Sequence, residues 1–149
     1  MARTVTLLGV PVDLYLAAAR RTDELVREFA LISFGDRGRV SSRLLELVDD
    51  LRTNHAGTTA DIRARVDGAA RRGATFVDIE IPGEKRAVEL TVQLTDILDA
   101  ADEFCRSGDL LTLAESSDVA AWRHWWRDEV VAQARHGAAP TPWAERKDA

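Results

Sequence analysis

The pattern of apolar residues changes its period near the middle of the chain, and this change constrains the fold more than any other feature. In the segment ATFVDIEIPG, residues 74–83, apolar and polar side chains alternate, which is typical of a strand with one buried face. Over residues 84–107 the apolar positions recur at helical spacing, and Gly108 follows them. A strand followed directly by a long amphipathic helix predicts a domain that mixes both kinds of element.

The remaining segments predict two more strands and four more helices. A β-rich segment at residues 4–10 precedes a helical pattern over residues 12–33. Two helices are expected after the loop SFGDRGR, one capped by Ser41 or Ser42 and one beginning after Thr58. LLTLA, residues 110–114, reads as a third strand before a helix that begins after Ser116 or Ser117. The order β-α-α-α-β-α-β-α predicts a helix-rich α/β or α+β fold with a small three-stranded sheet, whose last two strands form a right-handed crossover.

The length and the hydrophobic content suit one domain. A chain of 149 residues with 46% hydrophobic residues is large enough for one continuous core. If it were divided into two domains, the core of each would be only marginally stable. We expect a single globular domain over residues 1–138. Residues 139–149 contain two prolines and are expected to form a loose C-terminal tail, with Trp143 as the residue that could be anchored.

The charge, the cysteine content and the absence of a long apolar stretch argue against several classes of protein. The formal net charge is −5, whereas a domain that binds nucleic acid usually clusters lysine and arginine to neutralise phosphates. The single cysteine, Cys105, cannot form an internal disulfide. No apolar stretch approaches the roughly 18 residues that span a bilayer. We therefore expect a cytoplasmic protein without nucleic-acid or membrane partners.

Three tryptophans lie within five residues of the last helix, in the segment AWRHWWRD. Trp122 and Trp126 share one helical stripe and are expected to pack in the core. Trp125 lies on another edge with Ala121 and Glu129, which suits a partner surface or a self-association surface. Tryptophan is enriched in such interfaces because it removes a large apolar area from water.

Carboxylates are concentrated on the helix over residues 84–107. They include Glu89, Asp96, Asp99, Asp102 and Glu103. Their spacing is explained by a solvated helix face, although pairs three or four residues apart can resemble an acid–base or metal pair. We expect Asp96, Asp99 and Glu103 to offer an acidic surface to an arginine-rich partner.

Side chains for catalysis or cofactor binding are not arranged in a recognisable pattern. His55, His124 and His136 do not have the spacing of a metal site. Cys105 follows the apolar Phe104 and is expected to be a buried thiol, because no histidine is placed by sequence to activate it. The dinucleotide fingerprint, the P-loop and the G-x-S-x-G elbow are missing from the sequence. We therefore expect no catalytic, cofactor-binding or metal-binding residues.

Three segments resemble a family of small actinobacterial regulatory proteins: LLGVPVDLYLAAARRTDELVREFALI, ILDAADEFCRSGDLLTLAESSDVAAWRHWWRDEVV and PTPW. Members of this family are associated with ATP-binding serine kinases of the anti-sigma-factor type, which act in partner-switching signalling. The Glu-x-x-x-Asn helix and the Asp-x-Gly-x-Gly loop of those kinases have no counterpart in this sequence. The resemblance therefore implies a regulatory or scaffolding role without ATP binding.

Three hypotheses follow. The first is a non-catalytic protein-interaction module in bacterial signalling or stress regulation, which binds another regulatory protein or itself as a homodimer. The alternative is a small-ligand sensor, with Tyr15 and the tryptophans lining an apolar pocket between the sheet and the helices. This second hypothesis requires a closed cavity near Trp122, which solid packing would exclude. The third, an enzyme, would need a cleft with a strongly perturbed carboxylate or His124.

Overall fold

The computed structural model of the chain describes residues 3–34, 42–43, 45–46, 49, 60–108 and 110–145. The described elements form a helix-rich α+β fold. Of the two fold classes expected from the sequence, α/β and α+β, the second is confirmed. In chain order they are β1 (Arg3–Pro11), α1 (Val12–Phe34), α3 (Ala60–Arg71), β2 (Phe76–Gly83), α4 (Lys85–Ser107), α5 (Ser117–His136) and the 3-10 helix η2 (Trp143–Glu145). The helix expected from Ser41 or Ser42 lies largely outside the described residues.

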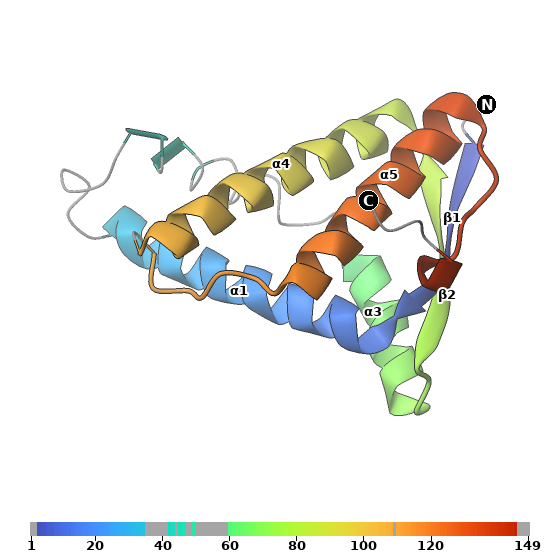
Figure 1. The fold of residues 1–149 in the computed structure, drawn as a ribbon, viewed down its shortest axis with the longest axis horizontal. Helices are drawn as coiled ribbons and strands as arrows, with labels where there is room; N and C mark the ends of the chain where they lie inside the picture. The colour runs from blue at the N-terminus through green and yellow to red at the C-terminus, as the bar shows by residue number, and fades with distance from the viewer. Residues whose placement is uncertain are drawn as a thin grey trace.

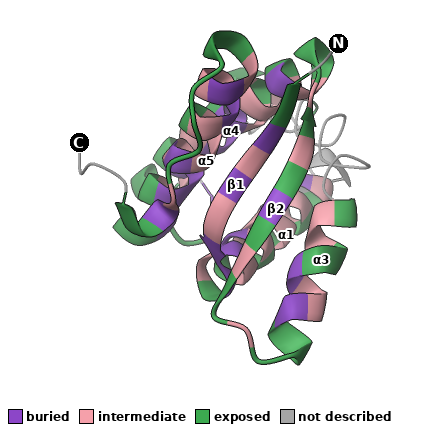
Figure 2. Cartoon of the chain, turned by 90° about the vertical axis from the view of Figure 1, so that its right-hand side faces the viewer, coloured by how far each residue is buried: buried purple, intermediate pink, exposed green. Residues whose placement is uncertain are grey.

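β1 and β2 form a two-stranded antiparallel sheet with an apolar inner face. Val5 pairs with Ile81, and Leu7 pairs with Ile79. Val5, Leu7 and Ile79 are fully buried. The intervening positions of β2 are exposed, as Figure 2 shows: Phe76, Asp78 and Glu80. The alternation predicted from the sequence of β2 is therefore confirmed.

A β-bulge interrupts the pairing between Leu7 and Val10. Gly9 lies in the bulge with a φ of +63°, a conformation that glycine adopts readily because it has no Cβ atom. The Gly9 amide donates a hydrogen bond to the Asp78 carboxylate at 2.8 Å. The extra residue shifts the alternation of side chains, so that Leu7 and Val10 are both buried.

The third expected strand does not form, so the three-stranded sheet and its parallel crossover are wrong. Residues 110–116 are an irregular connection between α4 and α5. The amides of Leu111 and Thr112 donate to the Glu28 carboxylate of α1 at 2.6 and 2.7 Å. Because this carboxylate satisfies the backbone donors, the segment does not need a neighbouring strand. Leu111 and Leu113 are left 91% and 83% exposed.

The long helices α1 and α4 are far apart beside the sheet and converge at the opposite end of the molecule (Figure 1). α5 packs against both of them. Where α1 and α4 converge, their apolar side chains form a separate small core: Leu25, Phe29, Ile97, Leu98, Ala101 and Leu110. The two helices therefore form a V, with the sheet at its wide end and this small core at its narrow end.

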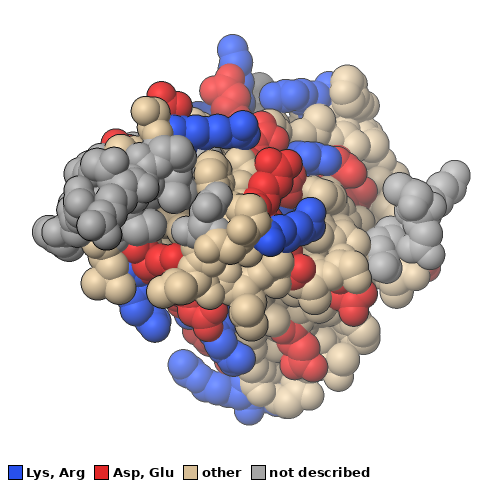
Figure 3. Space-filling model, turned by 60° about the vertical axis from the view of Figure 1, so that its left-hand side comes forward, with Lys and Arg blue, Asp and Glu red and all other residues tan. Residues whose placement is uncertain are grey.

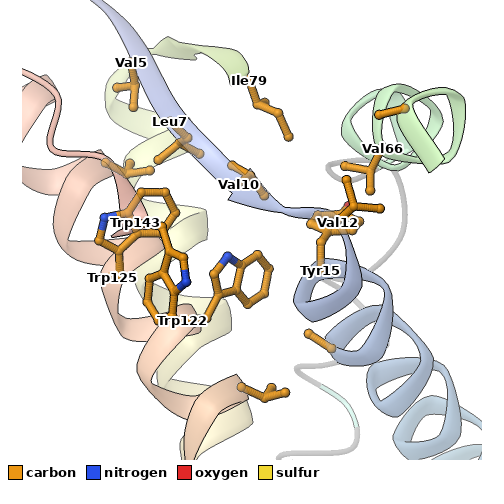
Figure 4. Packing of buried hydrophobic residues seen from close by; sticks show 14 of the residues in the cluster. Val5, Leu7, Val10, Val12, Tyr15, Val66, Ile79, Trp122, Trp125 and Trp143 are labelled. Carbon is orange, nitrogen blue, oxygen red and sulfur yellow. The ribbon is translucent and has the colours of Figure 1, made fainter. Parts of the chain in front are cut away.

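The larger core lies under the sheet, where α1, α3, α5 and η2 pack against β1 and β2. Figure 4 shows Trp122 of α5 beside Tyr15 of α1, with Trp125 and Trp143 together nearer to β1. Val66 of α3 is also fully buried. The sequence predicted Trp122 as a core residue correctly, and this residue is only 5% exposed.

The described part of the expected loose tail, residues 139–145, folds back along α5, and residues 146–149 lie outside the described residues. The ring of Trp143 packs edge to face on Trp125, with centroids 5.7 Å apart. Trp125 Nε1 donates to the Thr141 carbonyl at 3.1 Å, and the Thr141 amide donates to Glu129 at 2.7 Å. Apolar burial and two hydrogen bonds thus fix residues 141–145, with Trp143 anchored as the sequence allowed.

Candidate functional site

A pocket of about 430 Å³ lies between α1 and α4. α1, α3, the end of β2 and α4 form its walls, and α5 forms its base. Most of the described residues that line it are aliphatic or aromatic, and they include Ala18, Ile62, Ile81, Leu90 and Leu94. A volume of this size lies within the range of pockets that hold small organic ligands, roughly 300–1,000 Å³.

The splayed arrangement of α1 and α4 creates the pocket. Near the sheet the two helices are far apart (Figure 1). On the α1 wall the side chains of Ala18 and Ala19 are short, so they do not fill the space opposite Leu90 and Leu94 of α4. Protein interiors are normally close-packed, so a space of this size between helices is unusual. It is partly open, whereas the sensor hypothesis expected a closed cavity.

Three aromatic rings form the base of the pocket. The centroid of Tyr15 lies 5.7 Å from that of Trp122 and 6.1 Å from that of Trp126. The two tryptophan centroids are 5.6 Å apart. Because these rings contact one another, they make a continuous aromatic surface and not a cage around a cation. Burial raises the pKa of Tyr15 to about 12, although the nearby Arg63 opposes this shift.

The indole N–H of Trp122 is the one buried side-chain polar atom without a hydrogen-bond partner among the described residues. Trp122 lines the pocket. A buried donor that lacks a partner costs about 1–3 kcal/mol. This N–H is itself buried, so it lies behind the accessible surface of the pocket.

Threonines supply most of the uncharged polar groups of the walls. Thr22 lies on α1, and Thr91 and Thr95 lie on α4. Each hydroxyl donates its proton to the carbonyl four residues earlier in its own helix, at 2.9–3.0 Å. The three hydroxyl oxygens therefore keep only their acceptor capacity for a molecule in the pocket.

The arginines around the pocket are engaged within the chain. Both terminal nitrogens of Arg63 bind the Asp23 carboxylate, at 3.0 and 3.3 Å. Arg65 donates to the Glu80 carbonyl at 3.0 Å. These contacts join α3 to α1 and to β2, so the arginines hold the wall of the pocket together.

A buried ionic network lies beside the pocket. Arg123, whose side chain is 8% exposed, pairs with Glu115, whose side chain is 2% exposed. Arg123 also binds Asp99 at 2.7 Å. Burial alone would lower the pKa of Arg123, but its hydrogen bonds with Glu115 and Asp99 raise the pKa above its ordinary value. Arg21 of α1 binds the buried Asp102 at 2.9 Å. The network fixes the connection between α4 and α5 onto α1.

Trp125 is not the exposed interface residue that the sequence predicted. Its side chain is 6% exposed, because Trp143 and Thr141 cover it. Glu129 accepts hydrogen bonds from Thr141 and Gln133. Ala121 remains exposed. The helix edge expected to meet a partner is thus mostly occupied by the chain itself, and it no longer supports an interface at Trp125.

The predicted acidic surface of α4 is divided between solvent and internal contacts. Asp96 and Glu103 are exposed, whereas Asp102 is only 2% exposed. Asp99 binds Arg123 and also lies 3.0 Å from His124 Nε2. Basic and acidic side chains are interspersed on the face drawn in Figure 3, without a large patch of one sign. Asp99 is therefore part of the ionic network, and it also contacts His124, whose side chain is 42% exposed.

Sequence reasoning missed the burial of Arg123. An arginine on a helix is usually exposed, but Arg123 is buried and bound to carboxylates from α4 and the α4–α5 connection. Burial of Cys105 was anticipated, and the thiol is half-buried 3.5 Å from Arg21. Desolvation raises the pKa of that thiol. The nearest sequence signal for the network was the group of carboxylates on α4.

Comparison with protein-family models, with characterised proteins and with solved structures finds no match to this chain. The resemblance to the actinobacterial regulatory family therefore rests on the sequence segments alone. Among the described residues, no three His, Cys, Asp or Glu side chains are grouped so that they could hold a metal ion. No helix in this part of the chain is long and apolar enough to cross a membrane.

Proposed function

We propose that this chain is a non-catalytic regulatory domain that binds a small, mainly apolar ligand. The observation that carries the proposal is the pocket of about 430 Å³ with Tyr15, Trp122 and Trp126 at its base. The regulatory part rests on the resemblance of the sequence to proteins associated with partner-switching kinases.

The apolar lining sets the scale of binding that the pocket can support. Burial of about 300 Å² of apolar ligand surface contributes about 7 kcal/mol at 25 cal/mol per Å². Loss of ligand freedom reduces this value. We therefore expect dissociation constants of about ten micromolar or weaker for ligands that only fill the pocket.

The proposal is tested with N-phenyl-1-naphthylamine, an uncharged apolar dye that fluoresces when it leaves water. We expect the dye to bind the protein at one site and to quench tryptophan emission by energy transfer, because Trp122 and Trp126 line the pocket. The test variant is Ala19→Phe, which places a large side chain on the pocket wall. The matched control is Ala17→Phe, at an exposed position of the same helix.

Ala19→Phe should weaken dye binding at least tenfold, and Ala17→Phe should leave it unchanged. Thermal unfolding of both variants shows whether they remain folded. Leu94→Trp is a second filling variant on the opposite wall. The ligand-binding function is rejected if the dye does not bind the wild-type protein, or if the folded filling variants bind it as tightly as the control.

A protein-interaction module is the second candidate function. It is favoured by two leucines in the α4–α5 connection, Leu111 and Leu113, which are 91% and 83% exposed. Leu31, near the end of α1, is 69% exposed. It lies one helical turn after Glu28, whose carboxylate accepts the hydrogen bond from the Leu111 amide. If this region mediates self-association, Leu111→Ser with Leu113→Ser should reduce the solution mass from dimer to monomer. An unchanged mass would remove the support for this candidate.

A further inference from the structure

Two of the arginines around the pocket are paired with carboxylates of the same chain. Arg63 is neutralised by Asp23, and Arg123 is neutralised by Glu115 and Asp99. Asp61 and Arg65 lie one turn apart on α3 and have opposite signs.

Glu80 also lines the pocket, but it occupies an exposed alternate position of β2, opposite in direction to the buried Ile79. Its carbonyl oxygen is occupied by Arg65. Asp61 is likewise exposed, so the described lining offers no buried ionic group that is free to pair with a charged ligand. A charge without a partner is costly to remove from water.

The unused polar groups on the pocket walls are acceptors. The hydroxyl oxygens of Thr22, Thr91 and Thr95 can only accept, because their protons are bound to helix carbonyls. The indole N–H of Trp122 also lacks a partner among the described residues, but it is buried and is not exposed to the pocket. A ligand hydroxyl can donate its proton to a threonine oxygen without carrying a charge. A carboxylate has no proton to donate, and an ammonium group brings a charge into the pocket.

We propose that the pocket selects an uncharged ligand with an apolar body and a hydroxyl group. This inference rests on the proposed ligand-binding function. The apolar body contacts the aliphatic walls and the aromatic base. The hydroxyl group binds at the threonine-bearing walls, where α1 and α4 face each other.

The first experiment compares three probes that share one alkyl chain: 1-decanol, decanoate and decylammonium. Each probe is titrated at neutral pH to displace N-phenyl-1-naphthylamine from the full chain, with 1-decanol kept below its solubility limit and the charged probes below their micelle concentrations. We expect 1-decanol to bind at least about tenfold more tightly than either charged probe, because the charged groups lose hydration without gaining an ionic partner.

The outcomes separate the two proposals. If the dye binds but either charged probe displaces it as well as 1-decanol does, or 1-decanol does not displace it, this inference is overturned and the pocket remains a binding site. If the dye itself fails to bind, both proposals are overturned. Selective displacement by 1-decanol supports both.

The second experiment tests the threonines directly. Thr95→Val and Thr91→Val keep the side-chain shape and remove the hydroxyl oxygen, and Thr4→Val changes an exposed threonine of β1 as a matched control. We expect one or both pocket variants to weaken 1-decanol binding roughly three- to tenfold, the worth of one hydrogen bond. Binding of decyl methyl ether, which lacks a hydroxyl proton, should not change. The role of the hydroxyl group would be overturned if the folded pocket variants bind 1-decanol as tightly as the control does. It would also be overturned if they lose affinity for 1-decanol and decyl methyl ether equally.

Discussion

The ring of Tyr15 meets the indole of Trp122 edge to face at the base of the pocket, with centroids 5.7 Å apart. This contact joins the first turn of α1 to α5 beneath the sheet. It also removes the tyrosine from water, and Tyr15 is 8% exposed. The ionisation of this residue therefore reports on the integrity of the pocket base.

Tyr15 is the only tyrosine of the chain, so the absorbance of tyrosinate measures its ionisation without interference from another tyrosine. Burial raises its pKa to about 12, whereas the unfolded chain should ionise near pH 10. Because the pKa of Tyr15 is higher in the folded state, burial of the neutral phenol contributes fully to the unfolding free energy below about pH 10. This contribution is lost as the pH rises to 12. The loss amounts to about 3 kcal/mol. Tyr15→Phe should remove this pH dependence, and ionisation of the folded protein near pH 10 would refute it.

The buried pair of Arg123 and Glu115 should show strong coupling. Arg123→Met leaves Glu115 buried without its cation, and we expect it to lower the free energy of unfolding by about 3–5 kcal/mol. Replacing both residues with methionine removes both charges, so the double variant should be more stable than the sum of the single changes predicts. Urea unfolding of the four proteins measures the coupling. Additive effects would show that the two side chains do not stabilise each other.

The anchored C-terminal segment should contribute to stability. Trp143→Ala removes an 8% exposed ring from Trp125, and we expect a loss of about 3–5 kcal/mol in unfolding free energy. Tryptophan emission should also shift to longer wavelength as Trp125 becomes hydrated. Pro140→Ala, at an exposed position of the same segment, is the control and should have little effect. Equal stability of the two variants would mean that the segment is not held by its tryptophan.

Asp99 should link stability to acid pH. Desolvation alone would raise its pKa, but hydrogen bonds from Arg123 and His124 lower it below the usual value. Because the pKa of Asp99 is lowered in the folded state, the ionised carboxylate contributes fully to the free energy of unfolding above about pH 4, which is the ordinary pKa of aspartate. This contribution is lost as the pH falls further. Asp99→Asn should therefore flatten the acid limb of the stability curve, measured by urea unfolding. The exposed Asp96→Asn on the same helix should not, and identical curves for both variants would contradict the assignment.

The sequence predicted those elements whose pattern is local. The alternation at β2 and the helical periodicity of α1, α4 and α5 identify them without reference to other parts of the chain. Gly108 ends α4 as expected, with a φ of +83°, and Ser116 caps α5 by accepting from the Val119 amide. Each of these signals involves residues within one or two turns of each other.

The failures involve partners that are distant in the sequence. The segment LLTLA has strand-like composition, but Glu28, over 80 residues earlier, binds its amides. Trp125 has the pattern of a spare helix edge, but Trp143 covers it from the following segment. Arg123 is polar and yet buried, because carboxylates from two other segments surround it. A single sequence does not encode these encounters in any local pattern.

The pocket was predicted in part. The hypothesis of a small-ligand sensor placed Tyr15 and the tryptophans around an apolar space, and both Tyr15 and Trp122 line the pocket. The contribution of the α4 wall was not foreseen, because it depends on how far α1 and α4 diverge beside the sheet (Figure 1). Helix divergence follows from tertiary packing and not from the periodicity of either helix.

The most direct test of ligand binding is a crystal structure of the protein with N-phenyl-1-naphthylamine. The account predicts electron density for the dye between α1 and α4, with its rings against Trp122 and Trp126. Density for the dye only at another surface, or a space between these helices that is filled by the protein's own side chains, would contradict it.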